Sequence, residues 1–357
     1  MKRVFIAVTT LIFCAAALAS LSAAACAAAN NGLYLYEGKI YHIFFHSLII
    51  DTQKAFTSKN RGGYNDWMTT KDEFKAILPL LHREGFVLVN LTDIAKKQAD
   101  GKVVKKSIYL PRGKKPLVIS VDDVNYYEYM KGDGFAERLA LDDEGRVTAV
   151  VAGSGGTERF DSEGDVVPIL DSFVENNPDF SLNGAKGVLA VTGYQGVFGY
   201  RTNTLAGAER AEAAVCAAAV AKRLKDTGWT LASHSYTHMQ KFRDGSISLA
   251  DLKKDTQKWK AEVAPIVGST PVYITPFGCS FQPSGERLKH LTENGFYIFC
   301  PVYKEMNTIF GDTYVVNYRL NMDGYTMLRC PERMEKYFFN PSQIIDQARI
   351  KYFPQAK

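Results

Sequence analysis

Two adjacent carboxylates, Asp122 and Asp123, follow directly after an apolar run at 116–121. The run is largely β-branched, which indicates a strand buried on both faces. An ionised carboxylate is costly to bury without a partner, and two neighbouring carboxylates repel each other. We therefore expect this strand to direct the pair at a cation or at a reaction. Two solvated residues at a strand-to-loop junction are the alternative.

Two histidines, His234 and His238, follow a second apolar run at 229–232, about a hundred residues later. A carboxylate and two imidazoles are the ligand set of an open metal site, in which three protein ligands leave one position for water. This second motif weighs against the solvated alternative for the Asp pair. The two motifs together predict a metal centre.

The elements that must position these residues alternate between strands and helices, which predicts a parallel sheet. The clearest helix begins at Thr70, with Glu73 at the capping-box spacing, and Gly85 ends it. Expected strands lie at 39–48, 86–89, 116–121, 187–192, 229–232, 271–275, 296–299, 314–319 and 325–328. Further helices are expected at 91–98, 166–177, 208–227, 249–267, 285–293 and 342–351. With about seven strand–helix alternations, the chain is predicted to form an α/β barrel.

The polar, Gly-rich stretch at 124–186 interrupts this alternation. A turn at 142–146 separates two short expected strands within it, and the helix at 166–177 lies near its end. We expect an excursion from the barrel that contributes to the rim around a substrate.

The first residues are typical of a secretory signal: Lys2 and Arg3, an apolar run at 4–19, and then small residues. We expect a signal peptide at 1–29, with an uncertain cleavage site, and one domain over 30–357. No later apolar run reaches the roughly 18 residues of a membrane span. The mature protein is expected to be secreted or held at the cell surface.

The cysteines leave two questions open. Cys26 follows three alanines, but the Leu expected three positions before a lipidated Cys is Ala23, so a lipid anchor is not favoured. Cys300 and Cys330 end strand-like runs and could be neighbours in the fold. Disulfides or free buried thiols are both compatible with an exported chain.

Composition excludes some partners. The 357 residues are 46% hydrophobic and 23% charged, as in ordinary folded proteins. The formal net charge is only +5 and no basic run occurs, so nucleic acid is not an expected partner. No basis for predicting the oligomeric state is found in the sequence.

The order of these motifs resembles the polysaccharide deacetylases, the NodB-homology group or carbohydrate esterase family four. The resemblance is carried by Asp122-Asp123 after one strand, His234-x3-His238 after a later one, and 275–278 (Thr-Pro-Phe-Gly) after the next. It spans most of the mature chain. It implies a deformed (β/α) barrel whose site lies at the C-terminal ends of the strands.

By this resemblance Asp123, His234 and His238 would bind a divalent metal, with zinc the expected ion, and Asp122 would be the general base. Such a metal lowers the pKa of water and polarises an acetyl carbonyl. The substrate would be an acetylated amino-sugar polysaccharide of the cell wall or exterior, hydrolysed at its N-acetyl groups.

The acid that protonates the leaving amine departs from the common family pattern. Many members have a His in a late Leu-x-His motif, but this chain has Arg329 after Leu328. An early strand carries His46 instead, which resembles a permuted branch that includes poly-N-acetylglucosamine deacetylases, so His46 is assigned as the acid. A core histidine is the alternative, and His42 lies on the same face of the strand, so periodicity does not choose between them.

The third motif also departs from the family. Many members have an Arg that orients the base carboxylate where this chain has Thr275. Its loss could raise the pKa of Asp122, or another cation could replace it, and we suggest Arg319. Thr275, Pro276, Phe277 and Arg319 are the residues expected to line the substrate site.

Two other functions stay open. An O-acetyl carbohydrate esterase would use the same site and would tolerate loss of the acid better, because an alcohol leaves more easily than an amine. A non-catalytic glycan-binding surface protein would keep the barrel, and the substitutions at Thr275 and Arg329 favour it. A lyase or glycosidase would need paired acids without a metal, which His234 and His238 speak against.

Overall fold

The computed structural model describes residues 32–354, which divide into two units. The smaller unit includes the antiparallel pair β1 (Leu33–Tyr36) and β6 (Ile108–Pro111). All further elements belong to the larger unit, Lys39–Lys106 with Lys115–Lys357. The expected signal peptide and Cys26 lie outside the described residues. Within 32–354, no helix has the length and apolar character to cross a membrane.

A ten-stranded sheet forms the centre of the larger unit. Its order is β15-β16-β14-β13-β12-β11-β7-β2-β17, and β3 also pairs with β7. All neighbours are parallel except β15 and β16, as the strand–helix alternation predicts. The strands are β2 (Tyr41–Phe45), β3 (Phe86–Leu88), β7 (Lys115–Val121), β11 (Val188–Val191), β12 (Thr230–Ser233), β13 (Val272–Tyr273), β14 (Ile298–Phe299), β15 (Thr308–Phe310), β16 (Val315–Asn317) and β17 (Leu320–Asn321).

The two ends of this sheet are joined by one stretch of chain. β16 pairs with β14, β17 pairs with β2, and only Tyr318 and Arg319 separate β16 from β17. This last stretch therefore closes the sheet, and with β16 and β17 counted together the closed ring has seven parallel strands. The deformed barrel of about seven strands is confirmed.

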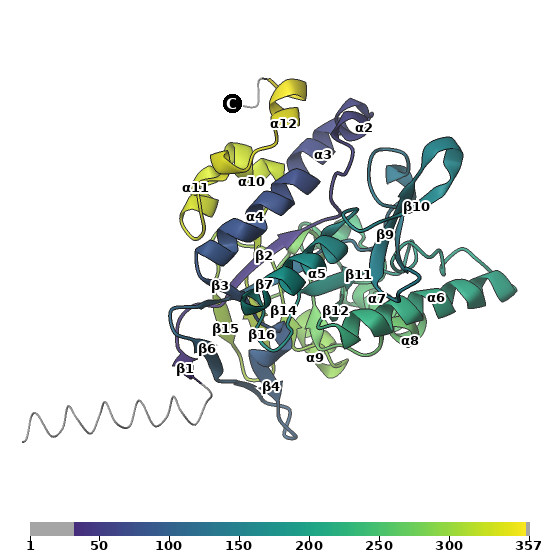
Figure 1. Cartoon of the computed structure of the whole chain (residues 1–357). Helices are drawn as coiled ribbons and strands as arrows, with labels where there is room; N and C mark the ends of the chain where they lie inside the picture. Colours follow the sequence, from purple (N-terminus) through teal and green to yellow (C-terminus); the bar gives the residue numbers. More distant parts are fainter. Residues whose placement is uncertain (1–31, 355–357) are drawn as a thin grey trace, which may run out of the picture. The chain divides into compact units, whose positions relative to one another are not determined.

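Helices lie on the outside of the barrel strands (Figure 1). They are α2 (Thr52–Thr57), α3 (Arg61–Trp67), α4 (Lys71–Arg83), α5 (Val166–Asn176), α6 (Gly207–Asp226), α7 (Leu249–Glu262), α8 (Ala264–Val267), α9 (Glu286–Glu293), α10 (Gly324–Arg329), α11 (Pro331–Glu335) and α12 (Gln347–Tyr352). The capping box before α4 forms as predicted: the Thr70 side chain accepts from the Glu73 N–H, and the Glu73 carboxylate accepts from the Thr70 N–H.

Several predicted elements differ from the structure. The stretch 91–98 is a short 3₁₀ turn (Leu91–Asp93) followed by β4 (Ala95–Lys97), which pairs with β5 (Val103–Lys105). The predicted strand at 325–328 is helix α10, because Asp323 caps its first turn by accepting from the Thr326 N–H.

Two helix predictions at the C-terminal half also need correction. The helix predicted at 249–267 is two helices, with Pro265 in the first turn of α8. The terminal helix begins at Gln347, not at 342, because a 3₁₀ turn occupies Pro341–Gln343.

The excursion at 124–186 contains a small antiparallel sheet of three strands, one more than predicted. Its strands are β8 (Arg138–Leu141), β9 (Val147–Ala152) and β10 (Glu158–Asp161), in the order β10-β9-β8. Helix α5 packs against β9. The predicted turn at 142–146 joins β8 to β9.

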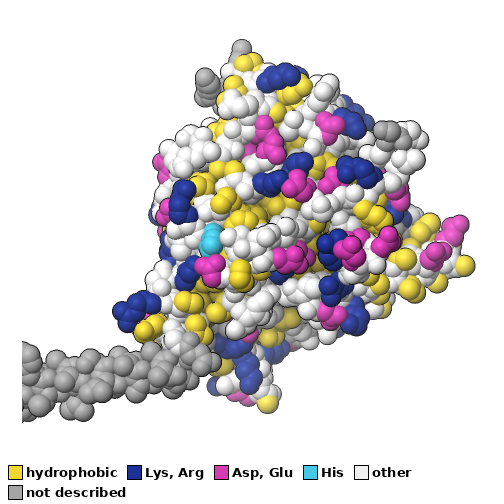
Figure 2. All heavy atoms as spheres, viewed as in Figure 1, with side chains coloured by type: hydrophobic (Ala, Val, Ile, Leu, Met, Phe, Trp, Pro, Cys, Tyr) yellow, Lys and Arg dark blue, Asp and Glu magenta, His cyan; other side chains and the backbone are white. Residues whose placement is uncertain are grey.

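The charges on one face of the protein and the four described cysteines bear on two further predictions. On the face in Figure 2, basic and acidic side chains are interspersed without a patch of one sign. Cys216, Cys279, Cys300 and Cys330 are all free thiols, so the pairing of Cys300 with Cys330 does not occur. Cys300 is buried directly after β14, whereas Cys330 follows α10.

Candidate metal centre

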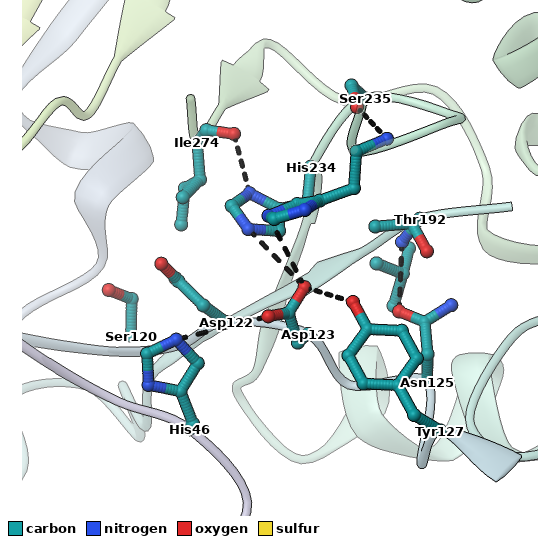
Figure 3. A network of polar contacts seen from close by, with 12 residues as sticks. His46, Ser120, Asp122, Asp123, Asn125, Tyr127, Thr192, His234, Ser235 and Ile274 are labelled. Carbon is teal, nitrogen blue, oxygen red and sulfur yellow. Dashed lines mark hydrogen bonds and ion pairs between the residues drawn. The ribbon is translucent and has the colours of Figure 1, made fainter. Parts of the chain in front are cut away.

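The predicted metal ligands converge at the C-terminal ends of neighbouring barrel strands. Asp123 follows β7, and His234 and His238 follow β12, with β11 between the two strands. Figure 3 shows the imidazole of His234 directed at the carboxylate of Asp123. Because the carboxyl ends of parallel strands share one edge, two motifs about a hundred residues apart become one site.

The three side chains have the donor atoms and spacing that a zinc-type ion requires. Asp123 Oδ1 lies 3.6 Å from His234 Nε2 and 3.7 Å from His238 Nε2. All three ligand atoms lie within 4.8 Å of one another. These separations exceed a hydrogen bond and approach the ~3.4 Å between ligands that tetrahedral zinc with bonds of about 2.0–2.1 Å would give. The residues present therefore fit such an ion.

Neighbouring groups fix the orientation of two of these ligands. His234 Nδ1 lies 2.8 Å from the carbonyl oxygen of Ile274 and donates to it, so Nε2 is left with its lone pair facing Asp123. The Tyr127 hydroxyl donates to Asp123 Oδ1 at 2.5 Å. Burial and the Asp123 charge raise the pKa of Tyr127 well above its usual value, so the phenol keeps the proton that it donates.

The loops that carry the ligands adopt strained backbone conformations. Asp123 has φ 58°, Ser235 61°, His238 47° and Phe277 54°, all in the left-handed region that non-glycine residues rarely occupy. Such residues cost of order 1–3 kcal/mol each and persist only where the surroundings over-determine them. All four lie around the carboxylate of Asp123 and the two imidazoles, so the surrounding structure must hold this cluster of side chains in place.

Asp122 is held by a buried arginine. Arg319 donates from two guanidinium nitrogens to the two carboxylate oxygens of Asp122, at 2.7 and 3.0 Å. The Arg319 side chain has no exposed surface, and that of Asp122 is 6% exposed. Burial alone would raise the pKa of Asp122, but Arg319 above all, together with His234, lowers it to about 2. A guanidinium therefore does reach this carboxylate although Thr275 occupies the usual Arg position.

A directional chain of hydrogen bonds anchors Arg319 inside the barrel. Its guanidinium donates to Ser120 Oγ at 3.0 Å, so the Ser120 hydroxyl proton is free to donate to His42 Nε2 at 2.9 Å. His42 Nδ1 then donates to the Asn317 side-chain oxygen at 2.6 Å. Burial lowers the pKa of His42 to about 3, so the ring is neutral, as this chain requires. His42 is therefore a core residue.

His46 lies on the other side of Asp123 from the two histidine ligands. Its Nδ1 lies 3.1 Å from the carbonyl oxygen of Trp67, and its Nε2 lies 3.9 Å from Asp123 Oδ2. The side chain is 20% exposed, so it borders the site and remains accessible to a substrate. The structure thus shows which of the two histidines borders the site: His46 does, and His42 is in the core, a choice that the strand periodicity left open.

The four residues expected to line the substrate site differ in exposure. Phe277 is 37% exposed and packs on the His238 ring with centroids 4.4 Å apart. Thr275 is buried, and within residues 32–354 its hydroxyl has no hydrogen-bond partner. Pro276 is buried too. Arg319 is fully buried, so it acts on Asp122 and does not reach a substrate in this conformation.

Sequence reasoning missed the groups that support the ligands, Asp255 and Tyr127. Asp255 on α7 accepts hydrogen bonds from the turn between the two histidine ligands. A signal was present: the buried positions of α7 are Leu252, Asp255, Thr256 and Trp259, so a charged residue occupies the core-facing stripe. No comparable signal singles out Tyr127.

Among the comparisons with known proteins, only the one with solved structures found proteins similar to this chain. No family model and no curated protein matches the chain. A Streptococcus pyogenes deacetylase, PplD, is similar at 12% identity and TM-score 0.47, over 82% of this chain and 97% of that one. A de-N-acetylase from Aggregatibacter actinomycetemcomitans is similar at 14% identity and TM-score 0.45, over 80% and 96%.

IcaB from Ammonifex degensii is also similar, at 12% identity and TM-score 0.41, over 74% of this chain and 83% of that one. With TM-scores below 0.5, these similarities do not identify a function, which has to be inferred from the geometry of the site itself.

Proposed function

We propose that the protein is a metal-dependent hydrolase that removes N-acetyl groups from an extracellular or cell-wall amino-sugar polysaccharide. The observation that carries the proposal is the convergence of Asp123, His234 and His238 on one point, with Asp122 and His46 beside it. The resemblance of the motifs to polysaccharide deacetylases supplies the substrate class. Zinc is the expected ion because the donors are two imidazoles and a carboxylate.

Each residue has a distinct task in this reaction. A divalent ion held by Asp123, His234 and His238 would supply Lewis acidity to the acetyl carbonyl and the attacking water. Asp122 accepts the proton that the water loses as its oxygen bonds to the carbonyl carbon. Arg319 holds the carboxylate in place while each Asp122 oxygen keeps a second lone-pair direction for that proton.

His46 completes the reaction. It donates a proton to the amide nitrogen as the C–N bond breaks, so acetic acid and a free amine leave and one water has been consumed; the acid then releases its proton to solvent. Its Nδ1 interaction with the Trp67 carbonyl orients the ring with Nε2 toward the site. The proton released to Asp122 balances the proton that His46 gives up.

The test is acetate release from oligomers of N-acetylglucosamine by the purified, zinc-loaded protein, with variants of each assigned residue. Asp122→Asn should retain the metal and lower kcat by about 10²–10⁴-fold. Asp123→Ala should lose the metal. If the wild-type protein binds no metal even after reconstitution, the hydrolase proposal fails and glycan binding without catalysis takes its place.

A parallel assay separates amide from ester substrates. His46→Ala should abolish turnover of N-acetyl substrates and spare O-acetyl substrates, because an alkoxide leaves with less help from an acid. Equal activity of wild type and variant on both would remove His46 from the mechanism. Activity confined to O-acetyl substrates in the wild type would identify an esterase.

A further inference from the structure

The turn between the two histidine ligands is conformationally strained. It comprises Ser235, Tyr236 and Thr237, and both Ser235 and the following ligand His238 have left-handed φ values. The Ser235 hydroxyl accepts from the His238 N–H at 2.9 Å, which favours this geometry from within the turn. A strained turn needs external support if His238 is to keep its position.

That support comes from one buried carboxylate on α7. Asp255, 2% exposed, accepts from the Tyr236 N–H at 2.9 Å on one oxygen. Its other oxygen accepts from the Thr237 N–H at 2.8 Å and from the Thr237 hydroxyl at 2.6 Å. All three donors belong to the turn between the ligands, so the carboxylate fixes two consecutive peptide units with both of its oxygens.

The opposite side of the same turn is held by the segment after β11. The Tyr236 carbonyl accepts from the N–H groups of Gly193 and Tyr194, both at 3.0 Å. Gly193 is required there, because a Cβ atom would lie 2.2 Å from the Tyr236 ring. The turn is therefore held between α7 and the end of β11. Among the described hydrogen bonds donated by the Tyr236 and Thr237 N–H groups, Asp255 is the only charged acceptor.

We propose that Asp255 is a positioning residue of the metal centre, which sets affinity for the ion by holding the Tyr236–Thr237 peptide units so that His238 faces Asp123 and His234. This inference rests on the proposed function, since it requires that the site binds a metal. Groups behind metal ligands typically change affinity or activity by 10–100-fold when they are lost.

The experiment measures zinc affinity of the metal-stripped full chain by competition with a chromophoric chelator. Asp255→Asn keeps the size of the side chain but replaces one acceptor oxygen by an NH₂ group that faces an N–H donor. We expect its dissociation constant for zinc to be about 10–100-fold higher than wild type. Asp251→Asn is the matched control on the same helix, because that carboxylate bonds Lys241 at the surface, and it should leave the affinity unchanged.

A milder pair of variants keeps the proposal testable if Asp255→Asn does not fold. Thr237→Val removes only the hydroxyl bond to Asp255 and should weaken zinc binding, whereas Thr237→Ser retains that bond and should bind as wild type does. Unfolding of each metal-free variant in urea separates loss of affinity from loss of the fold.

The outcomes distinguish this inference from the proposed function. If wild type binds zinc and Asp255→Asn binds it equally well, the positioning role is overturned while the hydrolase proposal stands. Should Asp255→Asn not fold, equal affinity of Thr237→Val and wild type would overturn it instead. If wild type binds no zinc, both proposals fail.

Discussion

At the scale of single residues, the charge on Asp122 is balanced inside the barrel and not by solvent. Its bidentate partner Arg319 also donates to Ser120 and to the Cys300 carbonyl, and its guanidinium lies 4.2 Å from the centre of the Phe44 ring. A buried guanidinium with this many acceptors cannot move independently of the carboxylate. The pair is therefore one unit, and removal of either member leaves a buried charge without its partner.

Arg319→Met should lower the free energy of unfolding by about 3–5 kcal/mol, because it leaves Asp122 charged and unpaired in the interior. Urea denaturation measures the change. Arg329→Met is the control, because Arg329 pairs with Asp66 at the surface with its side chain 52% exposed. That pair should contribute at most about 1 kcal/mol. A loss for Arg319→Met no larger than that of the control would contradict the buried-pair interpretation.

The buried, neutral His42 predicts a pH dependence of stability. Its pKa is about 3 in the folded protein, chiefly because of burial and also because of Arg319, against 6.5 as the ordinary value. Between these values the unfolded chain binds a proton that the folded chain does not, so stability is full above pH 6.5 and falls as the pH drops toward 3. One such group contributes a slope of up to about 1.4 kcal/mol per pH unit.

His42→Gln should remove that part of the slope in urea unfolding of the metal-free protein between about pH 4.5 and 7.5. His82→Gln, which removes a half-buried histidine paired with Asp179, serves as the control. An unchanged slope in His42→Gln would show that the ring is protonated in the folded state.

At the scale of elements, the C-terminal helix α12 contributes a buried side chain, Arg349, that also supports the site. Arg349 bonds the buried Glu73 carboxylate and donates to the carbonyl oxygens of Asn65 and Met68. These two residues lie on either side of Trp67 in the sequence, and the Trp67 carbonyl oxygen lies 3.1 Å from His46 Nδ1. The segment that orients His46 is thus fixed by an element more than two hundred residues further along the chain.

Arg349→Met should destabilise the protein by about 3–5 kcal/mol, because Glu73 is then buried without its cation. Hydrogen exchange should become faster in α12 and in residues 65–68 than in the barrel strands. Lys351→Met removes an exposed cation from the same helix and should leave both quantities unchanged. Equal exchange in the two variants would show that α12 does not depend on Arg349.

Elements with a local signal were predictable, and those that depend on distant contacts were not. The capping box of α4 and the strand before Asp122 are encoded by neighbouring residues. The helix at 324–329 was missed because its aromatic and apolar residues suit a strand, and the capping signal of Asp323 was not recognised. The pairing of Arg319 with Asp122 could only be guessed, since 197 residues separate them and no pattern in either segment points to the other.

At the scale of the whole molecule, the site's parts come from many elements that meet only in the folded state. The three proposed metal ligands lie on two strand ends, the proposed base on one of them, and the proposed acid on a third. The parallel barrel topology made this meeting predictable from the sequence, because all strand ends of one kind share an edge. What could not be predicted is the set of loop conformations that turns Asp123 and His238 toward each other.

Because the ligands converge only in the folded chain, ion binding should stabilise the whole protein. Zinc at about a hundred times its dissociation constant should add about 2.7 kcal/mol to the free energy of unfolding. Thermal melts with and without a chelator measure this difference. Asp123→Ala should melt at the same temperature in both conditions, and a wild-type melt that does not respond to zinc would contradict the predicted centre.

The stretch that joins β16 to β17 has a consequence for the order in which the protein folds. Residues 315–321 connect the two ends of the ring of strands and include the arginine that pairs with Asp122, so the ring is open and Asp122 lacks its guanidinium until they dock. Closure of the ring of strands and pairing of Asp122 with Arg319 therefore depend on the same residues, 315–321. A folding intermediate that already brings Asp123, His234 and His238 together is therefore expected to lack the oriented Asp122 carboxylate until β16 and β17 have docked.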